Sequence, residues 1–436
     1  MHDAPKLKIW TAISVVIGCV IGSGVFVKPG RVLLAVGDSN MALLAWLLGG
    51  VISLAGGLSV AEISTRIPKS GGVYVYIEEL FGKLWGFLCG WVQAIIYGPA
   101  LMAALALYFG SLMAQFLNLP DTQMVKPIAL LSLVILSGVT AFSTSWSAFI
   151  QNSTTFVKLI PIAVLGIGGL FMGDAPIFNM QLASNPQATG MGVAILATLW
   201  AYDGWIQVSN LAEELENPVK NLPRAIIIGL VAVIITYIVV NMSLFHVVPL
   251  EQIAILNEKT AAVASETLFG SWGGRILSLG ILISIFGCLN GNILTMTRVP
   301  YAMALRGAFP SAQIFALLHP RFKTPVNSIA LKTFISAGMV LLLDPDRVTD
   351  IALFSIYIFY GAVFMGVIVL RKKFGAPDKG NYRVPLYPVV PLIAGGGCFY
   401  ICYAMSTQAP WDATISLAVA LTGIPVYYWM QRKKAQ

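Results

Sequence analysis

The sequence contains few charged residues for its length. Of its 436 residues, 11% are Asp, Glu, Lys or Arg, whereas 57% are hydrophobic. A water-soluble chain carries roughly 25% charged residues, because its surface must be hydrated. Most of the surface of this chain must therefore contact something other than water. This excludes an ordinary soluble fold and indicates a protein surrounded by lipid.

The residue clusters that carry enzymatic chemistry are also missing. The three histidines, His2, His246 and His319, form no cluster with acidic residues, so we expect no metal site and no catalytic base. No phosphate-binding loop follows a soluble strand, which excludes an ATP-driven pump. The five cysteines lie in apolar segments and are expected to be free thiols. The sequence therefore predicts neither an enzyme nor a protein with a cofactor.

Long apolar runs make up most of the chain. Crossing a hydrocarbon core about 30 Å thick takes about 20 helical residues, and we find about twelve runs of that length. No alternating strand pattern appears, and lipid offers no partners to the backbone, so these runs predict helices. The predicted fold class is an all-α membrane protein with twelve transmembrane helices, in a single domain over residues 1–436.

The distribution of Lys and Arg predicts the orientation of these helices. Basic residues are concentrated at both chain ends and in every second loop, for example Lys69, Lys220 and the Arg371–Lys373 run. Because basic loops stay in the cytoplasm, both termini are predicted to be cytoplasmic. The net charge of +8 reflects this asymmetry and does not indicate a nucleic-acid partner.

The first and sixth apolar runs are interrupted at corresponding places. The first contains the cluster Gly22–Gly24, and the sixth contains Asp203–Gly204. Interrupted segments in two matching halves indicate a transporter with inverted repeats and a binding site near the bilayer midplane. The expected repeats are residues 8–172 (helices 1–5) and 190–371 (helices 6–10), followed by two C-terminal helices in 388–431.

Several segments match a known family in order and spacing. They are Ile21–Phe26 in the first helix, Pro68–Tyr76 after the second and Glu213–Ile226 after the sixth. These segments resemble the amino acid–polyamine–organocation superfamily. Tyr202–Trp205 and Phe286–Gly291 are most similar to the L-type amino-acid transporters, and among them to the bacterial alanine–serine–cysteine exchangers. The resemblance covers the whole chain. It implies a LeuT-like 5+5 inverted repeat with broken helices 1 and 6, amino-acid exchange, and a bacterial cytoplasmic (inner) membrane location.

One departure from that family concerns its partner protein. Eukaryotic L-type transporters join a heavy subunit through a cysteine between helices 3 and 4. The corresponding segment here, Asn118 to Lys126, contains no cysteine. We therefore expect no disulfide-linked heavy subunit, and the expected partners are small neutral amino acids and the lipid bilayer.

The two helix breaks provide backbone groups that suit an amino acid. A zwitterion needs donors for its carboxylate and acceptors for its ammonium, and unwound helices offer free N–H and C=O groups. We expect the carboxylate at Ser23 and Gly24, and the ammonium at carbonyls near Cys19, Val20 and Trp200. The expected substrate-binding residues are Cys19, Val20, Ile21, Gly22, Ser23, Gly24, Trp200, Ala201, Asp203 and Asn290.

Several of these residues have a structural alternative. Trp200 is expected to cover the bound side chain, and the alternative is an aromatic that packs against lipid or a helix. Asp203 at membrane depth is either functional or paired with a neighbouring helix. Asn290 either faces the site or forms an interhelical hydrogen bond, and Gly18 and Gly22 are spaced for close helix packing.

Two lysines lie within apolar runs. By resemblance to sodium-coupled transporters of this fold, the Lys158 ammonium is expected where a cation would bind, near the carbonyls of Gly18 and Ile21. Lys158, Gly18 and Trp200 are thus the expected coupling and gating residues, and snorkelling is the alternative for Lys158. Lys332, close to the start of its run, is expected to snorkel to the cytoplasmic surface.

The predicted function is sodium-independent exchange of small neutral amino acids by alternating access. Neutral selectivity follows from the single acidic residue near the site, whereas alanine, serine and cysteine are implied by the resemblance. Proton-coupled uptake, with Asp203 or Lys158 titrating, and a membrane amino-acid sensor remain open as alternatives.

Overall fold

The computed structural model is a bundle of helices. It describes residues 8–67, 72–178, 180–182, 189–206, 208, 215–378 and 382–435. Two segments that carry the family resemblance, Pro68–Tyr76 and Glu213–Ile226, lie partly outside these described residues.

Helices of the first half run from the N-terminus to Met172. They are α1 Ile9–Val20, α2 Gly24–Val27, α3 Pro29–Val36, α4 Ser39–Arg66, α5 Val73–Phe81, α6 Lys83–Val92, the π-helical turn η1 Gln93–Tyr97, α7 Gly98–Phe116, α8 Asp121–Phe142, α9 Thr144–Val157 and α10 Leu159–Met172.

Helices of the second half begin at Met191. They are α11 Met191–Tyr202, α12 Pro218–Val247, α13 Leu250–Leu256, the 3₁₀ turn η3 Asn257–Lys259, α14 Thr260–Met296, α15 Arg298–Leu305, α16 Ala312–Phe315, α17 Val326–Leu342, α18 Pro345–Phe374, α19 Val389–Gln408, α20 Pro410–Leu421 and α21 Gly423–Ala435.

Membrane-length apolar helices account for most of the described chain. Within the described residues, nine helical stretches are long and apolar enough to cross a membrane. Three shorter apolar helices, α10, α11 and α17, complete the set. The prediction of an all-helical chain built from membrane-length segments is confirmed. The grouping of these helices into two inverted repeats stays a prediction.

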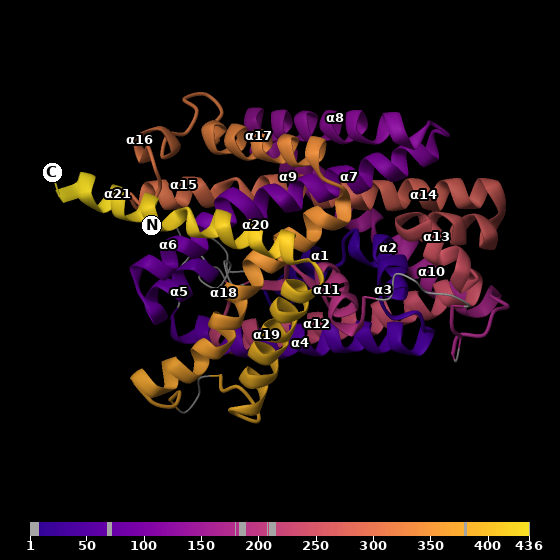
Figure 1. Ribbon diagram of the computed structural model, residues 1–436, viewed down its shortest axis with the longest axis horizontal. Helices are drawn as coiled ribbons and strands as arrows, with labels where there is room; N and C mark the ends of the chain where they lie inside the picture. Colours follow the sequence, from indigo (N-terminus) through magenta and orange to yellow (C-terminus); the bar gives the residue numbers. More distant parts are fainter. Residues whose placement is uncertain are drawn as a thin grey trace.

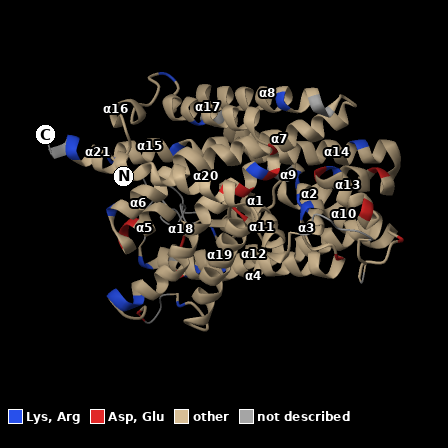
Figure 2. Cartoon of the chain, viewed as in Figure 1, with Lys and Arg blue, Asp and Glu red and all other residues tan. Residues whose placement is uncertain are grey.

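Several long helices, among them α4, α8 and α14, run roughly along the longest axis of the molecule, whereas α19 runs across it (Figure 1). Figure 1 shows both chain ends toward the same end of this axis, on the left of the view. In Figure 2, α4 and α12 are uncharged along most of their length. Such an arrangement suits a protein whose middle section is surrounded by hydrocarbon and whose two ends meet water.

The helices that precede the two breaks are supported by a common pair of helices. Helix α1 packs along α12, α11 packs along α4, and α4 and α12 pack against each other. The two interrupted segments are thereby brought to the same depth in the bundle, which is where the candidate site forms.

A buried ion pair ties one end of this support. Glu62 of α4 is 0% exposed, and its carboxylate accepts hydrogen bonds from Arg371 of α18, at 2.8 Å from Nε and 2.6 Å from Nη2. The backbone N–H of Val384 donates to the same carboxylate at 2.7 Å. Three separate chain segments thus depend on one acidic side chain.

Replacing Glu62 should test this dependence. Glu62→Ala leaves the Arg371 guanidinium without its carboxylate, and breaking a buried pair in this way costs about 3–5 kcal/mol. We expect a clear fall in the Tm of the detergent-purified protein. Glu251→Ala, at an exposed position of α13, is the control and should change stability by less than about 0.5 kcal/mol. Equal Tm values for the two variants would contradict the stabilising role of Glu62.

Candidate substrate-binding site

The first helix break is an unwound segment between α1 and α2. Helix α1 ends at Val20, Ile21 takes an extended conformation with ψ 98°, and helix geometry resumes at Gly24. The first N–H groups of a helix have no acceptor within it. The segment around Ser23 and Gly24 therefore presents unpaired donors in the middle of the bundle.

The second break follows α11 and lies directly against the first. Asp203 is extended, with ψ 158°, and Gly204 has φ +106°, a conformation that side chains rarely adopt. A Cβ at Gly204 would lie 2.8 Å from the carbonyl oxygen of Cys19. A Cβ at Gly24 would lie 2.4 Å from the Cα of Ala201. Glycine is required at both positions because the two breaks pack backbone to backbone.

Tyr237 of α12 bonds to both broken helices. Its hydroxyl lies 2.9 Å from the carbonyl oxygen of Val20 and 2.9 Å from that of Ala201. The side chain is 0% exposed. Sequence reasoning missed this residue, and its signal would have been a polar aromatic within the apolar run of α12.

A cavity of about 180 Å³ lies where the breaks meet. The expected site residues that line it are Gly18, Cys19, Val20, Gly22, Ser23, Gly24, Trp200 and Asp203. The remaining lining residues come from α7, α9, α14 and the second break: Leu101, Leu105, Gln151, Gly204, Cys288, Gly291, Asn292, Leu294 and Thr295. Ile21 and Ala201, although they belong to the breaks, do not line the cavity.

Asn290 is placed outside the cavity. Its side-chain amide donates to the backbone carbonyl of Ser147 at 2.8 Å and accepts from the Ser147 hydroxyl at 2.9 Å. Both residues are 0% exposed. Asn290 therefore forms the interhelical hydrogen bond that is the alternative to facing the site, and this bond joins α14 to α9. Asn292, two residues further along α14, lines the cavity instead.

Lys158 lies at the junction of α9 and α10, where it is 2% exposed. Its ammonium donates a hydrogen bond to the backbone carbonyl of Gly18, in the last turns of α1. The side chain does not line the cavity; it attaches the first broken helix to the α9–α10 pair. Its head group is therefore buried among helices and does not reach an interface.

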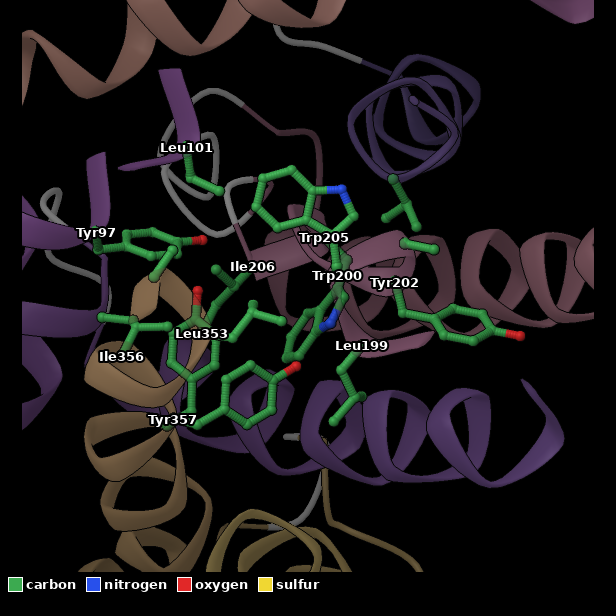
Figure 3. Packing of buried hydrophobic residues seen from close by; sticks show 14 of the residues in the cluster. Tyr97, Leu101, Leu199, Trp200, Tyr202, Trp205, Ile206, Leu353, Ile356 and Tyr357 are labelled. Carbon is green, nitrogen blue, oxygen red and sulfur yellow. The ribbon is translucent and has the colours of Figure 1, made fainter. Parts of the chain in front are cut away.

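Asp203 contacts both the cavity and two tyrosines. Tyr97 of η1 donates its hydroxyl to one carboxylate oxygen, and Tyr360 of α18 lies 3.4 Å from the other. Figure 3 shows Tyr97 and Tyr202 on opposite sides of the segment that carries Trp200 and Trp205, with the Tyr202 ring pointing away from Tyr97. Asp203 is thus paired with neighbouring helices and also lines the cavity, and its functional role stays a prediction.

One end of the cavity is closed by an aromatic and ionic layer. Trp200 is 7% exposed and its ring packs edge-on against Tyr108 at 6.4 Å. The Lys28 ammonium lies 5.3 Å from the Tyr108 ring and 5.9 Å from the Trp200 ring. Lys28 bonds to Asp346 of α18 at 2.7 Å. Trp200 therefore lines the cavity, where it is expected to cover a substrate, and also packs against Tyr108 and Lys28.

A second ion pair extends this layer outward. The guanidinium of Arg31, in α3, lies 3.2 Å from the Asp350 carboxylate and 4.0 Å from Asp346. Burial lowers the pKa of Arg31, but the charges of Asp350 and Asp346 outweigh burial and raise it above its ordinary value. The closed end thus joins α2 and α3 to the start of α18 through complementary charges.

The opposite end of the cavity is accessible. Cys19 is exposed even though it lies within a membrane-length apolar helix, and Thr295 near the C-terminal end of α14 is also exposed. The accessible path therefore runs between the last turns of α1 and α14, on the side remote from the Lys28–Asp346 pair.

Comparison with known proteins gives the family. Residues 7–430 match the amino acid permease family. The chain belongs to this family. It is therefore a multi-pass membrane transporter and not an enzyme.

Relatives that align along the whole permease are amino-acid transporters. The serine/threonine exchanger SteT of Bacillus subtilis (strain 168) is 46% identical over 97% of this chain and 96% of its own length. The cystine/glutamate transporter of Homo sapiens is 31% identical, over 97% of this chain and 84% of its own. The large neutral amino acids transporter small subunit 2 of Homo sapiens is 32% identical, over 98% of this chain and 82% of its own length.

The accessible path predicts the reactivity of the native cysteines. A hydrophilic thiol reagent should modify Cys19 much faster than Cys89, which is 0% exposed, because only the former is reached through the cavity. Intact-mass spectrometry of the purified permease measures the rate of each addition. Cys288 also lines the cavity, so the test uses a Cys288→Ser background. In this background Cys19→Ser should remove the fast addition, and persistence of that addition would contradict the described accessibility.

Proposed function

We propose that this permease exchanges small neutral L-amino acids, such as alanine, serine and cysteine, by alternating access without sodium. We further propose that it acts in a bacterial cytoplasmic membrane with both termini inside, as a LeuT-like 5+5 inverted repeat. The observation that carries the proposal is the meeting of two helix breaks around one small cavity. The segment Asn118 to Lys126, which runs from the α7–α8 connection into α8, contains no cysteine, which supports function without a disulfide-linked heavy subunit.

The backbone around the cavity suits a zwitterion. The substrate carboxylate would accept hydrogen bonds from N–H groups and the hydroxyl at Ser23 and Gly24. The ammonium would donate to carbonyls at the end of α1, near Cys19, and at the end of α11, near Trp200, because a carbonyl oxygen that already accepts one hydrogen bond has a second lone pair. Because these groups are backbone dipoles held in a low-dielectric site, they bind both charges without burying an unpaired ion.

The cavity suits a small and neutral side chain. Its volume of about 180 Å³ is below the ~300–1,000 Å³ typical of sites for drug-sized ligands. Among the described residues, Asp203 is the single acidic or basic residue of its lining, and its carboxylate already accepts tyrosine hydroxyls. A cationic or anionic substrate would therefore lack a free counter-charge. The similarity to a serine/threonine exchanger supports a small polar substrate as well.

Lys158 provides a permanent cation beside the first break. Its ammonium on the Gly18 carbonyl stabilises an unwound backbone that a bound cation would otherwise stabilise. We propose that this replaces a sodium ion, so the empty carrier would not need sodium to reorient. Trp200 and the Lys28–Asp346 pair would then close one end, and the path beside Cys19 would open the other.

A flux assay tests this function. Permease in liposomes should take up labelled serine or alanine only when the lumen contains amino acid, with no requirement for sodium or a pH gradient. Strict sodium dependence would contradict the role of Lys158. Uptake driven by a pH gradient into empty liposomes would favour proton coupling through Asp203. Binding without any flux would favour a sensor.

Removing the Lys158 ammonium should slow exchange while preserving the fold. Lys158→Ala deletes one charge-assisted hydrogen bond, worth about 1.5–3 kcal/mol, so we expect a loss of about 10- to 100-fold in exchange rate. The initial rate of serine exchange measures this effect, with Tm recorded in parallel. Lys83→Ala, at an exposed position, is the matched control. A wild-type exchange rate for Lys158→Ala would contradict the proposed role of the Lys158 ammonium.

A further inference from the structure

Lys332 of α17 is fully buried and does not reach a surface. Its side chain is 0% exposed, so the expectation of snorkelling to the cytoplasmic surface is wrong. The ammonium instead donates to the backbone carbonyl of Gln93, at 3.0 Å. A lysine at membrane depth is costly unless it is paired, and here the partner is a carbonyl and not an acid.

The carbonyl that Lys332 contacts begins the π-helical turn η1. Within η1, the N–H of Gly98 bonds to the Gln93 carbonyl five residues earlier. Pro99 follows, and since proline has no N–H, regular α-helical bonding cannot continue through it. Helix α17 contacts this irregular turn a second time, because the Ser336 hydroxyl donates to the Pro99 carbonyl at 2.9 Å.

The last residue of η1 carries the contact to the substrate cavity. Tyr97 donates its hydroxyl to Asp203, which lines the cavity. Each helical residue turns the chain by about 100°, so relaxation of the extra residue in η1 would rotate Tyr97 by about that angle. The position of the Tyr97 hydroxyl therefore depends on the π-turn being kept.

We propose that Lys332 is a positioning residue for substrate recognition. Its ammonium holds the Gln93 carbonyl at the start of η1, and η1 in turn directs Tyr97 to Asp203 in the cavity. Lys332 thus acts on the substrate site from a helix that does not line it. The inference rests on the proposed exchange of small amino acids, because its readout is the KM for serine.

Three variants test this chain of contacts. Lys332→Met removes the ammonium at nearly constant length, Tyr97→Phe removes only the hydroxyl, and the third variant combines both changes. We expect each single variant to raise the KM for serine exchange about 10-fold. The double variant should be no worse than the more severe single variant, because both changes interrupt the same path.

A matched lysine provides the control. Lys126 of α8 also donates to a carbonyl of α17, that of Leu341, at 2.7 Å, but at the surface. Lys126→Met should leave KM unchanged. A merely structural role for Lys332 would lower the amount of folded transporter, and hence the maximal rate, at unchanged KM.

A second perturbation retains the charge. A Cβ at Gly98 would lie 2.2 Å from the Lys332 ammonium nitrogen, so Gly98→Ala should displace the ammonium and raise KM in the same way. This variant decides the question if Lys332→Met does not fold. Unchanged KM in the folded variants, or KM increases that multiply in the double variant, would overturn the inference. Failure of wild-type permease to exchange serine would instead overturn the proposed function.

Discussion

The structure depends on one constraint: backbone groups exposed by a broken helix cannot be satisfied by lipid. An unwound segment is tolerated at membrane depth only where protein or a water-filled cavity supplies its partners. Here the two breaks exclude lipid from each other by close packing, because Gly24 lies against Ala201 and Gly204 against Cys19. The Tyr237 hydroxyl lies within hydrogen-bond distance of a carbonyl beside each break.

The proposed transport chemistry follows from the backbone groups at the breaks. The start of α2 and the ends of α1 and α11 line one small cavity, which we propose as the binding site for a molecule carrying both charges. The same geometry makes the breaks natural hinges, since few backbone hydrogen bonds cross them. At one end, Lys28 and Asp346 hold the α2 side of the hinge to α18. The other end stays accessible beside Cys19.

The sequence predicted the parts of the site that are local in the chain. Gly22–Gly24 and Asp203–Gly204 interrupt apolar runs, so the breaks and their lining residues were visible without a structure. Pairings between distant helices were not visible. Asn290 lies two residues from Asn292 on one helix, and only the packing of α9 decides which of them faces the cavity. Tyr237 and Glu62 were missed because their roles require partners far away in the chain.

Two of the buried lysines, Lys158 and Lys332, show why position within an apolar run is a poor guide to a lysine's surroundings. Lys158 and Lys332 both donate to a carbonyl at an irregular helical segment, Gly18 before the first break and Gln93 in the π-turn. An ammonium has donors and no acceptor, so it satisfies freed carbonyls without competing for N–H groups that a substrate carboxylate needs. Distance to the surface along the chain favours snorkelling for Lys332, but its buried side chain is held by a hydrogen bond. The group that holds its ammonium, the Gln93 carbonyl at the start of the π-turn, lies on another helix. Where a membrane protein breaks helical regularity, a nearby buried lysine is therefore better explained by the break than by the interface.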